Sequence, residues 1–123
     1  MLQGNYNILI VDDSSDDRFI LKKILEKKGY FTTESSNWMD ALIKIGEGGV
    51  DIVILDLKMK EVDGLELLKL IRKDENTSTL PIIVYTSTNI YDAKKCIESG
   101  ANAFVSKQDS PEVLIKNIQK LLP

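Results

Sequence analysis

The sequence predicts an α/β fold in which a parallel sheet is covered by helices on both faces. Short apolar, β-branched runs alternate five times with stretches whose apolar residues recur at helical spacing. Two of these runs, residues 8–11 and 52–55, are apolar throughout, which is typical of central strands buried on both sides. With right-handed crossovers, five strand-helix units make an open, doubly wound sheet.

The expected elements follow one another in order. The strands are expected at residues 7–11, 30–34, 52–55, 82–85 and 103–105. The helical patterns run through Phe19, Ile20, Ile24 and Leu25, then Trp38, Leu42 and Ile45, then Leu65, Leu68, Leu70 and Ile71, then Ala93 and Ile97, and last Leu114, Ile115, Ile118 and Leu122. Ser110-Pro111 provides the last helix with a cap and a proline at its first position. The second strand is the most polar, which suits a sheet edge, and the polar stretch 73–79 is expected to be a loop.

Length and charge limit what this protein can be. A chain of 123 residues has room for one compact domain, and its core is expected at about residues 7–122. The formal net charge of −3 argues against direct binding to nucleic acid, which requires clustered positive charge. No apolar run is long enough to span a bilayer, and no basic-then-apolar signal segment opens the chain. We therefore expect a cytoplasmic protein without membrane contact.

Two residue types are scarce. The single cysteine, Cys96, excludes an internal disulfide and a cysteine-cluster metal site. The chain contains no histidine, which excludes a Ser-His triad, a histidine-ligated zinc and a phosphohistidine. Its polar chemistry must therefore come from carboxylates, hydroxyls and lysines.

Polar residues follow four of the five expected strands. They are Asp12 and Asp13 after the first strand, Asp56 after the third, Thr86 and Ser87 after the fourth, and Lys107 after the fifth. In doubly wound sheets, ligands bind outside the carboxyl ends of the strands, so these side chains are expected at one site.

Taken singly, each of these residues is explained as a helix cap or a turn former; Asp13 or Ser14, for example, could cap the first helix. Taken together they are not, because Asp56 is not followed by a helical pattern and Lys107 caps nothing. Clustered carboxylates repel by about 4 kcal/mol per pair at about 4 Å, so a cation must offset them. Mg²⁺, which prefers oxygen ligands, would do so.

The same residues suit phosphoryl transfer. A carboxylate can attack phosphorus and form an aspartyl phosphate. The rest of the reaction needs positioning and neutralisation of charge. A metal held by Asp12 and Asp13 would neutralise one side of the phosphoryl group, Lys107 another, and the Thr86 hydroxyl could donate a hydrogen bond.

Four motifs now identify a resemblance. They are I-L-I-V-D-D at 8–13, V-I-L-D-L-K-M at 53–59 with V-D-G at 62–64, I-V-Y-T-S at 83–87, and G-A-N-A-F-V-S-K at 100–107. The chain resembles the receiver domain of two-component response regulators from about Asn7 to Leu122. That resemblance implies a flavodoxin-like (βα)5 fold with strand order 2-1-3-4-5.

The resemblance also implies roles. Asp56 would be the phosphoacceptor, and Asp12, Asp13, Asp56 and the backbone carbonyl of Lys58 would hold Mg²⁺. Thr86, Ser87, Lys107 and Phe104 would contact the phosphoryl group or act in switching. The donor would be a sensor histidine kinase or a histidine phosphotransfer protein. Partner binding would change through the fourth helix, fifth strand and fifth helix, and the only chemistry would be Mg²⁺-dependent self-phosphorylation and self-dephosphorylation.

Three positions depart from the usual family pattern. Lys60 replaces a proline, and Phe104 replaces the common tyrosine, whose hydroxyl it lacks. Gln108 follows Lys107 where many members have a proline after a cis bond. Because a cis bond before a non-proline residue costs about 2.5–4 kcal/mol, we expect this bond to be trans, or cis under strain.

Other functions remain to be weighed. A receiver-like binding module that is never phosphorylated would keep the fold, and the change at Gln108 leaves that alternative open. A phosphatase would carry a second acid two residues after its nucleophile, where this chain has Lys58. A flavin carrier would need a hydroxyl-rich phosphate loop after the first strand, which is missing.

Overall fold

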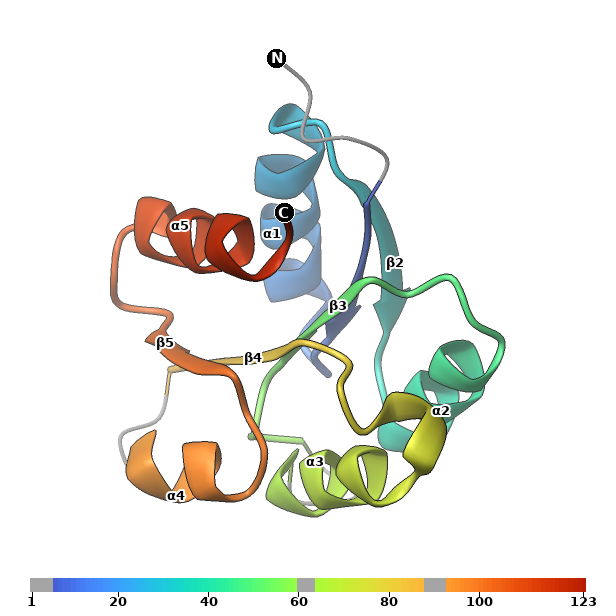
Figure 1. Ribbon diagram of the computed structural model, residues 1–123. Coiled ribbons are helices and arrows are strands. Elements are labelled where there is room, and N and C mark those ends of the chain that lie inside the picture. Colours follow the sequence, from blue (N-terminus) through green and yellow to red (C-terminus); the bar gives the residue numbers. More distant parts are fainter. Residues whose placement is uncertain (1–5, 60–63, 88–92) are drawn as a thin grey trace.

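The computed structural model describes residues 6–59, 64–87 and 93–123 and contains a five-stranded parallel sheet (Figure 1). The strand order is β2-β1-β3-β4-β5, as expected. The strands are β1 (Asn7–Val11), β2 (Phe31–Ser35), β3 (Ile52–Leu55), β4 (Ile82–Thr86) and β5 (Ala103–Ser106). The helices are α1 (Ser15–Lys27), α2 (Trp38–Gly46), α3 (Gly64–Lys73), α4 (Ala93–Glu98) and α5 (Pro111–Leu121), with a short 3-10 helix η1 (Glu75–Thr77).

The sheet separates two apolar clusters. Because successive strand residues point to opposite faces, Ile8 and Ile10 of β1 pack with α1 and α5, whereas Leu9 and Val11 pack with α2, α3 and α4. Figure 1 shows α1 and α5 on one side of the strands and the other three helices on the opposite side. Every residue of β3 is buried, which explains its unbroken apolar sequence.

The strand register brings the carboxyl ends of the strands to one edge. Val11 at the end of β1 lies opposite both Ser35 of β2 and Leu55 of β3. Thr86 at the end of β4 lies opposite Ser106 of β5. The residues that immediately follow these strands are therefore neighbours.

Several local expectations were wrong by a residue or more. The second strand begins at Phe31 rather than Tyr30, because the Tyr30 N–H bonds to the carbonyl of Leu25 at the end of α1. The expected loop at 73–79 contains η1, which the Asp74 side chain caps. Ser110 stands at the cap position of α5, but its hydroxyl makes no cap hydrogen bond.

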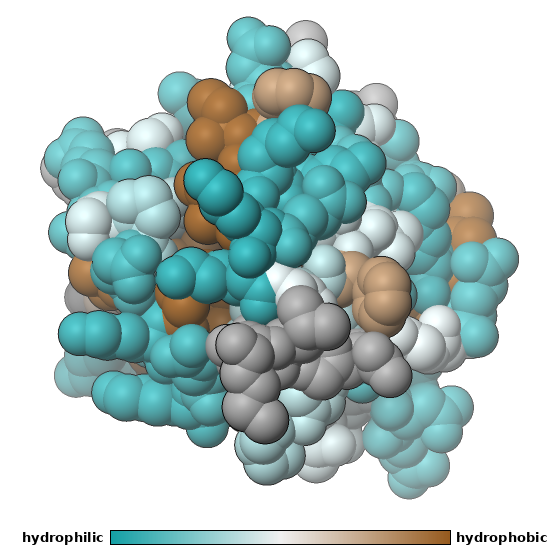
Figure 2. All heavy atoms as spheres, turned by 90° about the horizontal axis from the view of Figure 1, so that it is seen from above, coloured by the Kyte–Doolittle hydropathy of each residue, from teal (hydrophilic) through white to brown (hydrophobic). Residues whose placement is uncertain are grey.

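Some apolar residues expected to pack are exposed. They are Phe19 and Ile20 of α1, Leu70 of α3 and Ile97 of α4. Viewed from above, the surface is mainly hydrophilic, with hydrophobic residues in smaller patches (Figure 2). Within the described ranges, no helix is long and apolar enough to cross a membrane.

Arg72 at the end of α3 fastens the amino end of the sheet. Its Nε, Nη1 and Nη2 donate to the Gly100 carbonyl at 2.8 Å, the Thr77 carbonyl at 3.0 Å and the Asn102 Oδ1 at 2.9 Å. The Asn102 Oδ1 also accepts from the backbone N–H of Ile82 at the start of β4, at 2.8 Å. Gly100 has a φ of 117°, and a Cβ there would lie 2.5 Å from the Arg72 Cγ, so glycine is required.

Candidate functional site

Two buried carboxylates lie side by side after the central strands. Asp12 follows β1 and Asp56 follows β3, with exposed fractions of 5% and 7%. Backbone hydrogen bonds continue the sheet through both residues: Asp12 N donates to the Ser35 carbonyl at 3.1 Å, and Asp56 N donates to the Val11 carbonyl at 2.9 Å. The sheet itself thus fixes the positions of both acids.

Lys107 joins these carboxylates from β5. Its Nζ lies 2.6 Å from Asp12 Oδ2, 2.8 Å from Asp17 Oδ2 and 3.0 Å from Asp56 Oδ2. An ammonium group has three protons, so these three contacts use all of its donors. The peptide after Lys107 is trans, the unstrained one of the two forms that the sequence left open, since the described residues contain no cis bond.

Burial and charge oppose each other at this site. Burial raises the pKa of Asp12, although hydrogen bonds from Lys107 and from the Ser14 N–H act in the other direction. Burial also disfavours the Lys107 ammonium, but its hydrogen bonds to Asp12, Asp17 and Asp56 outweigh this and raise the pKa of Lys107. Lys107 is therefore charged at neutral pH.

An acidic cleft of about 370 Å³ opens beside the two aspartates. It is lined by Asp12, Asp13, Ser14, Asp17, Asp56, Lys58, Met59 and Ser87. The remaining oxygens of the buried acids are held by the backbone, since Asp12 Oδ1 accepts from Ser14 N at 2.9 Å and Asp56 Oδ1 accepts from Lys58 N at 3.1 Å. The cleft therefore offers fixed carboxylate oxygens to a ligand.

The donors in this cleft suit Mg²⁺. Across residues 6–59, 64–87 and 93–123, no group of three or more acidic or cysteine side chains forms a metal site by itself. Mg²⁺ does not require one, because it is usually bound by one or two carboxylates together with water and phosphate oxygens. The oxygens of Asp12, Asp13 and Asp56 are hard ligands of this kind.

The hydroxyl and aromatic candidates occupy different surroundings. Thr86 is buried at the end of β4, and Ser87, next to it, is exposed and lines the cleft. Phe104 is half-buried in β5 and packs against the cluster that β1 and β3 share with α2, α3 and α4. Lys60, residues 62–63 of the V-D-G motif and residues 88–92 lie outside the described residues.

Asp17 was not expected at the site. Its backbone N–H bonds to the Ser14 Oγ at 3.2 Å, which makes it part of the cap of α1. Its carboxylate, however, reaches Lys107. The signal that could have found it is position: the first turn of α1 and the residue after β5 both lie at the carboxyl edge of the sheet.

Comparisons with known proteins give a consistent result. The sequence model described as the response regulator receiver domain matches residues 8–119. The chemotaxis protein CheY-3 of Vibrio cholerae is 32% identical over 127 residues, which cover 98% of this chain and 95% of that protein. The phosphate regulon regulator PhoB of Pseudomonas aeruginosa is 33% identical over 94% of this chain. The sensor histidine kinase CheAY of Helicobacter pylori is 31% identical over 95% of this chain.

The chain covers only part of two of these relatives. The matched region is 51% of PhoB and 15% of CheAY. Solved structures agree over their full length: the regulator TrrA of Thermotoga maritima, in complex with Mg²⁺-BeF, has a TM-score of 0.87 and 33% identity over 95% of this chain and 99% of its own. CheY4 of Vibrio cholerae has a TM-score of 0.87 and 28% identity over 97% of this chain and 100% of its own.

Proposed function

This chain belongs to the response regulator receiver domain family, and on that premise we propose that it is a phosphoacceptor switch in two-component signalling. A histidine kinase or a histidine phosphotransfer protein would donate the phosphoryl group, and Asp56 would accept it. Support for such a donor comes from CheAY, a sensor histidine kinase of which one part is similar to this chain. A cytoplasmic location belongs to the same proposal.

One observation carries the proposal. The Asp56 carboxylate lies at the open cleft with its Oδ2 3.0 Å from the Lys107 Nζ. In the reaction, a carboxylate oxygen of Asp56 forms a bond to phosphorus as the bond between phosphorus and the donor's imidazole nitrogen breaks. Lys107 would then neutralise charge on the transferred group, and the hydroxyls of Thr86 and Ser87 would contact its oxygens.

Mg²⁺ fits the acidic cleft and would be held by Asp12, Asp13, Asp56 and the carbonyl of Lys58. When bound, it would supply positive charge beside the phosphoryl oxygens. The solved TrrA complex with Mg²⁺-BeF supports this by analogy.

Output would follow from movement near the site. A phosphoryl group adds about −1.5 to −2 charge, enough to change the contacts of Lys107 and Thr86. Thr86 lies opposite Ser106, two residues after Phe104, so a shift at β4 passes directly to β5. Partner binding would then change through α4, β5 and α5.

The test is an intact-mass measurement with a small-molecule phosphodonor, with and without Mg²⁺. We expect one Mg²⁺-dependent phosphoryl adduct on the natural protein and none on Asp56→Asn. Asp51→Asn is the matched control, because Asp51 accepts a hydrogen bond from Asn7 N at the opposite end of the sheet. It should be phosphorylated normally.

A second function is favoured by one feature of the site. Because Lys107 already offers all three protons to carboxylates, the site is partly neutralised without a metal. A binding module that is never phosphorylated would need nothing more. Folded protein that takes no adduct with Mg²⁺ present would favour that module and overturn the switch.

A further inference from the structure

Asp17 contacts the site without having a part in the proposed chemistry. It lies in the first turn of α1, where the bond from its backbone N–H to the Ser14 Oγ fixes it. Its carboxylate is 46% exposed and its Oδ2 lies 2.8 Å from the Lys107 Nζ. Among the described carboxylates that contact Lys107, only Asp17 is neither a proposed metal ligand nor the proposed phosphoacceptor.

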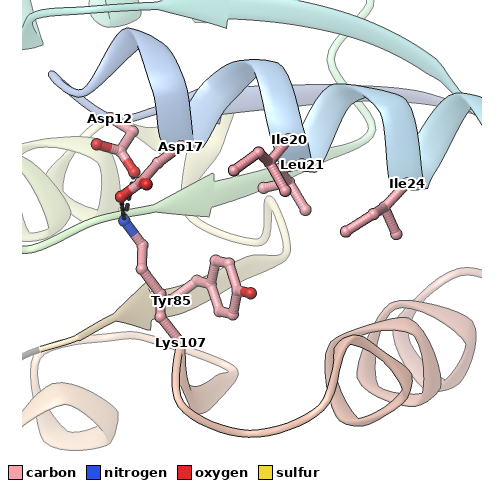
Figure 3. Close-up of a pocket in the computed structure, with 7 residues that line it drawn as sticks. All are labelled: Asp12, Asp17, Ile20, Leu21, Ile24, Tyr85 and Lys107. Carbon is pink, nitrogen blue, oxygen red and sulfur yellow. Dashed lines mark hydrogen bonds and ion pairs between the residues drawn. The ribbon is translucent and has the colours of Figure 1, made fainter.

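The path of the Lys107 side chain makes this contact important. The chain extends from the end of β5 past Tyr85 toward α1, as Figure 3 shows, and its Nζ lies 5.9 Å from the centre of the Tyr85 ring. A second cavity of about 190 Å³ lies along this path, lined by Tyr85, Lys107 and apolar residues of α1. Asp12 and Asp17 line both this cavity and the acidic cleft, so the ammonium is held between the two spaces.

During the proposed reaction, two partners of Lys107 change. Asp56 would become an acyl phosphate, and the Asp12 carboxylate would also bind Mg²⁺. The Asp17 contact requires no change, because Lys107 already reaches Asp56 at 3.0 Å while bonded to Asp17. We propose that Asp17 is a positioning residue that keeps the Lys107 ammonium at the phosphorylation site. The proposal rests on the proposed function.

The matched control is the neighbouring acid. Asp16 lies in the same first turn and is exposed, and its carboxylate makes no hydrogen bond or ion pair to any residue the structure describes. Asp16→Asn removes the same charge from the same helix end as Asp17→Asn. A difference between the two variants therefore reports the contact with Lys107 rather than the loss of one negative charge near the acidic cleft.

The experiment has two readouts, each on the natural protein, Asp17→Asn and Asp16→Asn. The first is the NMR order parameter of the Lys107 side chain in unphosphorylated protein. The second is the rate of adduct formation with a small-molecule phosphodonor at saturating Mg²⁺. Asp17→Asn should lower the order parameter and slow phosphorylation by roughly two- to fivefold, as expected for a partly exposed ion pair. Asp16→Asn should change neither.

A third comparison tests whether Asp17 acts through the lysine. In a Lys107→Met background, Asp17→Asn should cause no additional slowing. An unchanged order parameter, equal slowing by Asp16→Asn, or additional slowing in the Lys107→Met background would each overturn the positioning role. If the natural protein takes no phosphoryl group, the proposed function fails, and the order parameters alone decide whether Asp17 holds Lys107.

Discussion

The two ends of the sheet each hold a cation with three hydrogen bonds, and the partners of those cations are opposite in kind. At the amino end, Arg72 donates to the neutral oxygens of Gly100, Thr77 and Asn102. At the carboxyl end, Lys107 donates to three carboxylates. Arginine suits the first place because its planar fork matches fixed acceptors, and lysine suits the second because its ammonium is a compact charge on a flexible stem.

The amino end of the sheet is arranged for stability, whereas the carboxyl end holds a cluster of charged side chains. Arg72 itself belongs to α3, and its acceptors belong to η1 and to the turn before β5, so the arginine ties α3 to a segment that is distant in sequence. At the other end, burial raises the pKa of Asp12, which means that the surroundings of this acid disfavour its charged form. Substitutions at the two ends should therefore change different properties.

The largest effect is expected at the carboxyl end. Lys107→Met keeps most of the apolar stem and removes the ammonium that faces Asp56. Phosphorylation by a small-molecule donor should slow by about a hundredfold or more, the usual cost of losing one charge-stabilising donor. Intact-mass time courses measure the rate. A rate near that of the natural protein would contradict a functional role for the carboxyl end, because Lys107 would then be only a structural counterion.

The next effect is expected at the amino end. Arg72→Met should lower the free energy of unfolding by about 2–3 kcal/mol, because three acceptors lose a charged donor. Urea unfolding measures this loss. Arg72→Lys should not restore it, since a lysine cannot supply three fixed donors. The phosphorylation rate of the folded fraction should stay unchanged; a slowed rate would show that the two ends are coupled.

Gly100→Ala tests the packing at the amino end of the sheet, with a smaller expected effect on stability. The positive φ of Gly100 and the close approach of Arg72 predict a loss of about 1–2 kcal/mol in urea unfolding. Gly46→Ala is the control, because a Cβ at this helical glycine would meet no atom within 4 Å. It should leave stability unchanged or raise it slightly. Equal losses in both variants would contradict the steric argument.

The smallest effect concerns pH. The pKa of Asp12 is raised above its ordinary value of 3.8 by burial, so the folded protein binds this proton more tightly than the unfolded chain. The contribution of Asp12 to the free energy of unfolding should therefore fall as pH rises from about 3.8 through the raised pKa. Asp12→Asn lacks this proton, so it should gain stability relative to the natural protein across that window. Unfolding curves of both proteins, measured without metal at several pH values, would show this gain. A difference in the free energy of unfolding that stays constant with pH would contradict it.

Sequence reasoning reached the sheet and the strand ends but not the side-chain contacts between distant elements. Asp12, Asp56, Thr86 and Lys107 could be placed at one edge because all parallel strands end there. Neither the Arg72 contact with Gly100 nor the Asp17 contact with Lys107 could be predicted, because each joins residues far apart in the chain through long side chains. The helical spacing of apolar residues also predicted packing for Phe19, which is exposed, because α1 buries Leu21 and Leu25 instead.

The most direct test of the proposed function is to find which aspartate at the carboxyl edge of the sheet carries the phosphoryl group. Protein phosphorylated in the presence of Mg²⁺ would be reduced with borohydride, which converts an aspartyl phosphate to homoserine, and then digested and sequenced by mass spectrometry. We expect homoserine at position 56 and an unmodified aspartate at positions 12, 13 and 17. Homoserine at any of those three positions, or aspartate retained at position 56 of phosphorylated protein, would contradict it.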